Sequence, residues 1–153
     1  MGGSIPEENV REAIQQACLT ELEALKPGNV HVHAEGHGMT VGHFRASAAI
    51  AAEHLSRRDT SLGEKILGAV ECSVVEVGCN TNLGIVLLCA PLAEAALAAE
   101  GEGTLRERLA RVLRNLNIED ASYVYEAIRM ASPGGLGDSD EHDVADEPTV
   151  DLR

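Results

Sequence analysis

The sequence predicts an all-α fold, a compact multi-helix bundle with a buried central helix and polar connecting loops. Hydrophobic residues make up 44% of the 153 residues and aromatic residues only 2%, so the core must consist of Ala, Leu, Ile and Val. Small side chains of this kind let helices approach each other closely. Apolar residues also recur at three- and four-residue spacing in several segments, which is the period of an amphipathic helix.

The first predicted helix begins near Ser4 and Pro6 and ends at the Pro27-Gly28 pair. Ser4 is suited to cap this helix, and Pro6 is suited to its first turn. One stripe of apolar residues at helical spacing is expected to face the core, and it consists of Val10, Ile14, Ala17, Cys18, Leu22 and Leu25.

Four further helices are each preceded by a residue that commonly caps a helix N-terminus. These are Thr40 before a helix expected over 41–57, Ser61 before 62–77, Thr104 before 105–116, and Asn117 before a helix that ends at Met130 or Ala131.

Residues 83–99 form the most apolar segment, in which Glu94 is the only charged residue. A membrane-spanning helix is the alternative, but the segment is at the short limit for a span and contains both Glu94 and Pro91. We therefore expect no membrane span but the central helix of the bundle, apolar on all sides because other helices surround it. Pro91 is expected to kink this helix or divide it in two.

The net charge of −13, from 12 basic and 25 acidic residues, argues against a nucleic-acid surface, which needs the opposite balance. An anionic small substrate would need a divalent cation between itself and the protein. The cysteines show no CxxC spacing and are expected to be reduced thiols in the core; they are Cys18, Cys72, Cys79 and Cys89. Reduced thiols and the lack of a secretory signal at the start of the chain predict a cytoplasmic protein.

The first polar segment, residues 26–39, follows the first helix. Lys26 precedes Pro27 and Gly28, so the backbone turns there and the lysine amine can point at an anion. His31 and His33 share a face in an extended segment and, with His37, give a weak zinc signal. From these residues alone, a solvated loop after a helix end, an anion site and a metal site all stay open.

The second polar segment, residues 78–82, places Asn80, Thr81 and Asn82 directly before the apolar helix. Such side chains beside the free N–H groups of a helix start can bind an anion. Thr81 or Asn82 could instead simply cap the helix.

The third polar segment, residues 132–147, joins a glycine-rich stretch to six acidic residues, Asp138, Asp140, Glu141, Asp143, Asp146 and Glu147. Oxygen ligands suit Mg²⁺, which bridges to substrate phosphates. A solvated acidic tail is the alternative.

The three polar segments contain, in this order, KPGNVH…GHGM…F..SA, GCNTNLGIVLL and PGGLG…DVADEPTV. Together these stretches resemble the triphosphoribosyl-dephospho-CoA synthase family, over about residues 21–150. The matching residues are Lys26, Pro27, Gly28, His37, Met39, Phe44, Ser47, Ala48, Gly78, Asn80, Thr81, Gly135, Leu136, Gly137, Asp143 and Val144.

This chain departs from the family pattern at two places. The synthases typically carry an Asp before the Met of the first segment, where this chain has Gly38. They usually have His-Lys-Gly after the Asn-Thr pair, where this chain has Asn82-Leu83-Gly84. The sequence of these stretches resembles more closely a divergent branch of the family, which is found in methanopterin-dependent one-carbon metabolism.

The resemblance implies a transferase for ATP and dephospho-CoA. The 2′-hydroxyl of the dephospho-CoA ribose would attack C1 of the ATP ribose and release adenine, while the triphosphate is retained. The residues implied for substrate binding, of phosphates above all, are Lys26, Gly28, Asn29, His31, Asn80, Thr81, Asn82, Gly135 and Gly137. His37 would protonate the leaving base, and Asp143 or Asp146 would accept the hydroxyl proton or, with Glu147, hold Mg²⁺.

Two other functions compete with this transferase. The departures at Gly38 and Asn82 suggest a nucleotide-binding or regulatory protein that has lost catalysis. A helical metal-binding module would instead use His31, His33 and His37.

The chain stops at Arg153, just as apolar residues return after Pro148. We therefore expect residues 1–153 to be a single helical domain and a fragment of a longer synthase-like protein, with 132–153 as an acidic loop and truncated end. A fragment that exposes a helix face built to be covered is expected to form a homo-oligomer.

Overall fold

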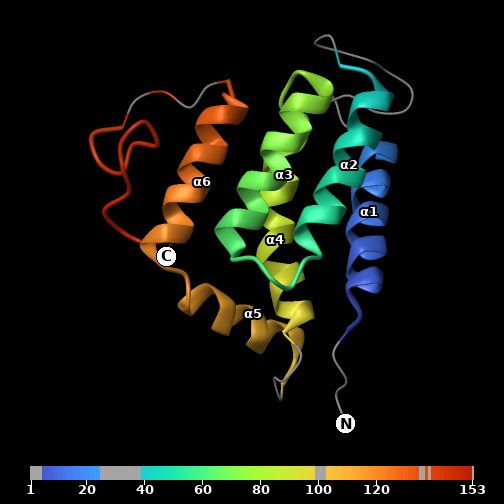
Figure 1. The fold of residues 1–153 in the computed structure, drawn as a ribbon, viewed down its shortest axis with the longest axis horizontal. Coiled ribbons are helices and arrows are strands. Elements are labelled where there is room, and N and C mark those ends of the chain that lie inside the picture. Colours follow the sequence, from blue (N-terminus) through green and yellow to red (C-terminus); the bar gives the residue numbers. More distant parts are fainter. Residues whose placement is uncertain (1–4, 25–38, 99–102, 135–136, 138, 153) are drawn as a thin grey trace.

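The computed structural model describes residues 5–24, 39–98, 103–134, 137 and 139–152. This part of the chain contains the helices α1 (Glu7–Glu23), α2 (Val41–Leu55), α3 (Leu62–Val77), α4 (Leu83–Leu97), α5 (Leu105–Arg114) and α6 (Ile118–Ala131). The predicted all-α fold is confirmed. Helices α1, α2, α3 and α6 stand side by side, α4 lies behind α3, and α5 lies below them in the view of Figure 1.

Side-chain caps fix where four of these helices begin. Thr40, Ser61, Thr104 and Asn117 each accept the backbone N–H of the residue three positions later, and that residue's side chain bonds back to the cap. The predicted caps are therefore confirmed. They could be predicted because a capping contact joins residues that are close together in the sequence. Helix α1 begins after Pro6 without a side-chain cap, and Ser4 lies outside the described residues.

The core is built mainly from small and branched aliphatic side chains. It joins Val10 and Ile14 of α1 to central residues of α2, α3, α4 and α6, which include Ala51, Ala52, Leu55, Ile66, Ala69, Val70, Val86, Ala90, Val124 and Ala127. The apolar stripe predicted for the first helix is correct at Val10, Ile14 and Leu22, which are buried, but Ala17 is exposed.

Helix α4 is central, because it contacts α1, α2, α3 and α5. Its outward face is not covered by any described helix, however, since Leu88 is 71% exposed and Leu92 is 42% exposed. The expectation that α4 is buried on all sides is therefore wrong. The helix runs unbroken through Pro91, so a division in two is wrong, while the alternative, a kink at Pro91, stays a prediction. Packing against four helices offsets the one backbone hydrogen bond that proline cannot donate.

None of the described helices is both long enough and apolar enough to cross a membrane.

The acidic segment after α6 folds back onto the bundle and runs alongside α6 in Figure 1. The Tyr125 hydroxyl donates a hydrogen bond to the His142 carbonyl at 3.2 Å, and the Arg129 guanidinium donates one to the Val144 carbonyl at 2.6 Å. Leu152 packs against the edge of the core. In the part that the structure describes, this segment is therefore a docked loop and not a free tail.

Candidate functional site

Several helix ends lie at one end of the bundle, which is uppermost in Figure 1. Helix α1 ends there and α2 begins there. The connection between α3 and α4 lies at the same end, and α6 ends there. Residues that are far apart in the sequence therefore lie at the same end of the bundle.

The turn between α3 and α4 is shaped by Gly78 and Asn80. Gly78 ends α3 in the left-handed conformation, with φ of 74°, and its N–H donates to the Val74 carbonyl at 2.8 Å. The Asn80 side-chain oxygen accepts the Leu83 N–H at 3.1 Å and so caps α4. Asn82 occupies the position before the helix but makes no capping bond with its side chain. The capping role expected of Thr81 or Asn82 thus belongs to Asn80.

Thr81 contacts α2 through Ser47, a fully buried residue. The two hydroxyl oxygens lie 2.5 Å apart. The single Ser47 hydroxyl proton is directed to the His43 carbonyl, at 2.9 Å, so Thr81 is the donor in its contact with Ser47. The Thr81 oxygen therefore keeps lone pairs for a ligand but has no proton left to donate.

The Asn82 side chain connects the turn between α3 and α4 to residues of α2 and α3. Its amide nitrogen donates to the Ser47 carbonyl at 3.1 Å and to the Ser73 hydroxyl at 3.4 Å. The Asn82 amide is thus a positioning group. Asn80 differs, because its capping bond uses only the side-chain oxygen and leaves its NH₂ group as a donor.

Sequence reasoning gave Ser47 and Ser73 no role. Ser47 belongs to the F-x-x-S-A stretch, and Ser73 lies within the apolar stripe of α3. A serine at a position where the helical period demands an apolar residue is the signal that could have found both of them, because a buried hydroxyl needs a partner.

The first turn of α2 adds a half-buried histidine to this end of the bundle. The His43 Nδ1 atom accepts the Thr40 N–H at 3.4 Å, and the His43 N–H donates to the Thr40 hydroxyl at the same distance. In the neutral ring the proton then resides on Nε2, which makes that atom a donor.

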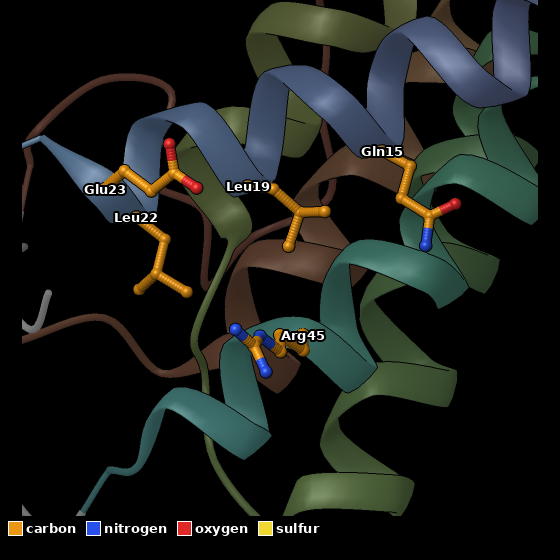
Figure 2. Close-up of a pocket in the computed structure, with 5 residues that line it drawn as sticks. All are labelled: Gln15, Leu19, Leu22, Glu23 and Arg45. Atoms are coloured by element: carbon orange, nitrogen blue, oxygen red, sulfur yellow. The ribbon is translucent and has the colours of Figure 1, made fainter. Parts of the chain in front are cut away.

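An open pocket of about 220 Å³ lies between α1 and α2. Figure 2 shows Arg45 of α2 facing Leu19, with Gln15 and Glu23 of α1 on either side, and Leu22 completes the lining. Arg45 precedes Ser47 by two positions, so it projects from nearly the opposite face of α2. The pocket and the Ser47–Thr81 contact therefore flank α2 on its two sides.

Asp143 uses its carboxylate to shape the acidic segment. One oxygen accepts the Ser139 N–H at 2.7 Å and the other accepts the Ala145 N–H at 2.8 Å. These bonds, the one to Ala145 first, lower the pKa of Asp143 below its usual value. The group stays ionised but becomes a weaker base.

Asp146 and Glu147 are exposed on the same segment, which the bonds from Tyr125 and Arg129 hold against α6. Within the described ranges, no group of three His, Cys, Asp or Glu side chains could hold a metal ion. Binding of Mg²⁺ by Asp143, Asp146 and Glu147 therefore stays a prediction.

Several residues chosen from the sequence lie outside the described part of the chain, namely Lys26, Gly28, Asn29, His31, His33, His37 and Gly135. Gly137 is described, and its φ of 66° is a conformation that glycine adopts readily. The structure brings together Asn80, Thr81 and Asn82 with Ser47, and it places Asp143, Asp146 and Glu147 beside α6.

The chain matches a known protein-family model. The family model described as "CitG: ATP:dephospho-CoA triphosphoribosyl transferase" matches residues 7–153, which is nearly the whole chain. No curated protein and no solved structure matches it.

Proposed function

Because the chain belongs to the CitG family of ATP:dephospho-CoA triphosphoribosyl transferases, we propose that it joins the triphosphoribosyl group of ATP to dephospho-CoA. In this reaction the 2′-hydroxyl oxygen of the dephospho-CoA ribose forms a bond to C1 of the ATP ribose. The bond from C1 to adenine breaks, adenine leaves with a proton from an acid, and a base takes the hydroxyl proton. The proposed activity is thus a glycosyl transfer.

The observation that carries this proposal is the contact between Ser47 and Thr81. It joins the F-x-x-S-A stretch of α2 to the G-x-N-T stretch before α4, although the two residues are 34 positions apart. A shared ligand surface explains why both stretches occur in one family, since binding groups gather where rigid elements present loops side by side.

The free hydrogen-bonding capacity at this end suits a ribose triphosphate. We assign the Asn80 NH₂ group to a phosphate oxygen, because it is a donor at a helix start. Thr81 offers only an acceptor, so we assign it to a sugar hydroxyl.

The remaining roles stay predictions. Lys26 would bind phosphates and His37 would protonate adenine. Both belong to the segment that connects the end of α1 to the start of α2. Asp143 has both oxygens engaged in hydrogen bonds and a lowered pKa, which argues against Asp143 as the base, so Asp146 stays the candidate for that role. A Mg²⁺ ion accompanying ATP also stays a prediction, and we assign it no step.

The test is release of adenine by the full chain in the presence of ATP and dephospho-CoA. We expect Thr81→Val to lower kcat/KM at least about tenfold, because one transition-state hydrogen bond is worth about 1.4 kcal/mol or more. Thr20→Val makes the same chemical change at an exposed position of α1 and should leave the rate unchanged. Absence of adenine release by the unaltered chain, or full activity of Thr81→Val, would contradict the proposal.

A nucleotide-binding or regulatory protein without catalysis is the second candidate. It is favoured by Leu83, which is buried at the position where the synthases usually carry a lysine. A buried leucine cannot bind phosphate. Calorimetry that detects ATP binding while no adenine is released would support this candidate, which we link to methanopterin-dependent one-carbon metabolism.

A further inference from the structure

Helix α5 is the least covered helix of the described bundle. Leu105, Leu109, Val112 and Leu113 give it an apolar face, yet none of its residues is buried. Leu105 is 43% exposed and Leu113 is 40% exposed, and Ile118 just beyond the helix is 51% exposed. Its main neighbour is α4. Helix α5 therefore leaves part of its apolar face uncovered, and it is the one described helix without a buried residue.

The same helix carries a local positive charge on a strongly acidic protein. Four arginines accompany a single acid, Glu107, in α5, while the whole chain has a net charge of −13. Arg106 and Arg114 are exposed, and neither forms an ion pair with any residue that the structure describes. In addition, the Arg108 Nε atom is buried without a hydrogen-bond partner within this part of the chain.

The acidic segment after α6 has the complementary character. Asp140, Glu141, Asp146 and Glu147 are exposed there and make no ion pair with described residues. The segment is held on α6 by the bonds from Tyr125 and Arg129, so these acids belong to a docked surface.

We propose that α5 docks on the acidic segment of a second copy of this chain. Two copies, each with a charge of −13, repel one another at most orientations. The arginines of α5 are the local exception, and placing them on the acids of residues 140–147 turns that repulsion into attraction. Leu105, Leu113 and Ile118 would be covered by the same contact. A twofold axis then makes the contact twice, once in each direction.

The first experiment measures the dimer dissociation constant of the full chain by sedimentation equilibrium. Arg106→Glu/Arg114→Glu should raise this constant by about tenfold to a hundredfold, since like charges would then face each other. Arg45→Glu/Arg57→Glu makes the same change in net charge, on α2 and just after its end, and should have a much smaller effect. Dissociation should also increase as salt is raised to about 0.5 M, because exposed charges are screened.

The second experiment mixes two variants that each fail to pair with themselves. Asp140→Lys/Glu147→Lys should also be monomeric, since its lysines face the α5 arginines. Mixed with Arg106→Glu/Arg114→Glu, it should form a heterodimer in which both contacts join opposite charges. Circular dichroism of each variant verifies the fold.

Three results would overturn the proposal. The first is a monomeric unaltered chain at about 100 μM, well above the dissociation constant of a stable dimer, which would mean that α5 meets another kind of partner. The second is a dimer that is indifferent to charge reversal on α5. The third is a mixture of the two variants that stays monomeric.

Discussion

The carboxylate of Asp120 on α6 accepts the backbone N–H of Gly63 on α3 at 2.9 Å. Its other oxygen accepts the Asn117 N–H at 3.2 Å, and Asp120 is buried. One side chain thus starts α6 and fastens it to α3. A Cβ atom on Gly63 would lie 2.8 Å from the Asp120 Cα atom, so the two backbones meet too closely for any larger residue.

Gly63→Ala should destabilise the protein by about 1–3 kcal/mol, because the added methyl group meets backbone that cannot give way. Urea unfolding followed by circular dichroism measures this difference. Gly84→Ala is the matched control, since nothing lies within 4 Å of its added Cβ. That substitution in the first turn of α4 should stabilise by up to about 1 kcal/mol. Equal effects of the two substitutions would show that the α3–α6 contact yields easily.

The ion pair of Lys65 and Glu94 fixes α3 to α4. Lys65 is fully buried and its amine bonds to the Glu94 carboxylate, which is about one-third exposed, at 35%. Glu94→Ala leaves a buried lysine without its partner and should cost about 3 kcal/mol in unfolding free energy.

The double variant Lys65→Met/Glu94→Gln removes both charges and should lie within about 1 kcal/mol of the unaltered protein. Urea unfolding measures the unfolding free energies of the single and double variants, which are then compared. A double variant less stable than Glu94→Ala would mean that the pair itself, and not the lone charge, controls stability.

The cysteines should differ in reactivity. All four are free thiols, as predicted, but Cys72 is exposed, so its expected place in the core is wrong. Position 72 falls on the outward side of α3. Burial, then the neighbouring Cys89 and Glu21, raise the pKa of Cys18 to about 11, and burial also raises the pKa of Cys89.

Because the thiolate is the nucleophile, Cys72 should react with iodoacetamide at pH 8 well before Cys18 or Cys89. Mass spectrometry of partly alkylated protein measures the order. In concentrated urea the three rates should converge. A Cys18 that reacts as fast as Cys72 in the folded protein would refute this prediction.

Asp143 should make the fold of the acidic segment sensitive to pH. Its pKa is lowered in the folded chain, so its stabilising effect is present above the usual value of 3.8 and is lost as the pH falls through the lower folded value. The amide signals of Ser139 and Ala145 in NMR spectra should therefore titrate with a midpoint below 3.8.

Asp143→Asn should speed hydrogen exchange at the Ser139 and Ala145 amides, because a neutral amide accepts these bonds less strongly. Asp140→Asn, on the same segment but without a described bond, serves as the control. A titration midpoint at or above 3.8 would contradict the assignment.

Local chemistry explains what could be predicted from the sequence. Thr40, Ser61, Thr104 and Asn117 identified four helix starts, because a cap and its N–H partner are three residues apart. Ends were less certain: α2 stops at Leu55 and α5 at Arg114, each two residues before the expected end. Local side-chain contacts determine the C-terminal residue of a helix less than its N-terminal residue, so tertiary packing determines where these helices end.

Contacts between distant residues could not be predicted. The pairing of Ser47 with Thr81 depends on how α2 packs beside the α3–α4 turn, which no periodicity encodes. The exposure of Leu88 depends likewise on which helices cover α4. The docking of the acidic segment on α6 could not be predicted either. Tyr125 and Arg129 donate to backbone carbonyls of that segment, and because every residue has a carbonyl, no residue type signals these bonds.

Several helix ends meet at one pole of the bundle, and α5 lies at the opposite pole. Substitutions in the connecting segments can therefore alter which molecule is recognised while the aliphatic interior keeps its packing. Such a scaffold is suited to divergence, since new specificity and thermal robustness are encoded by largely separate sets of residues.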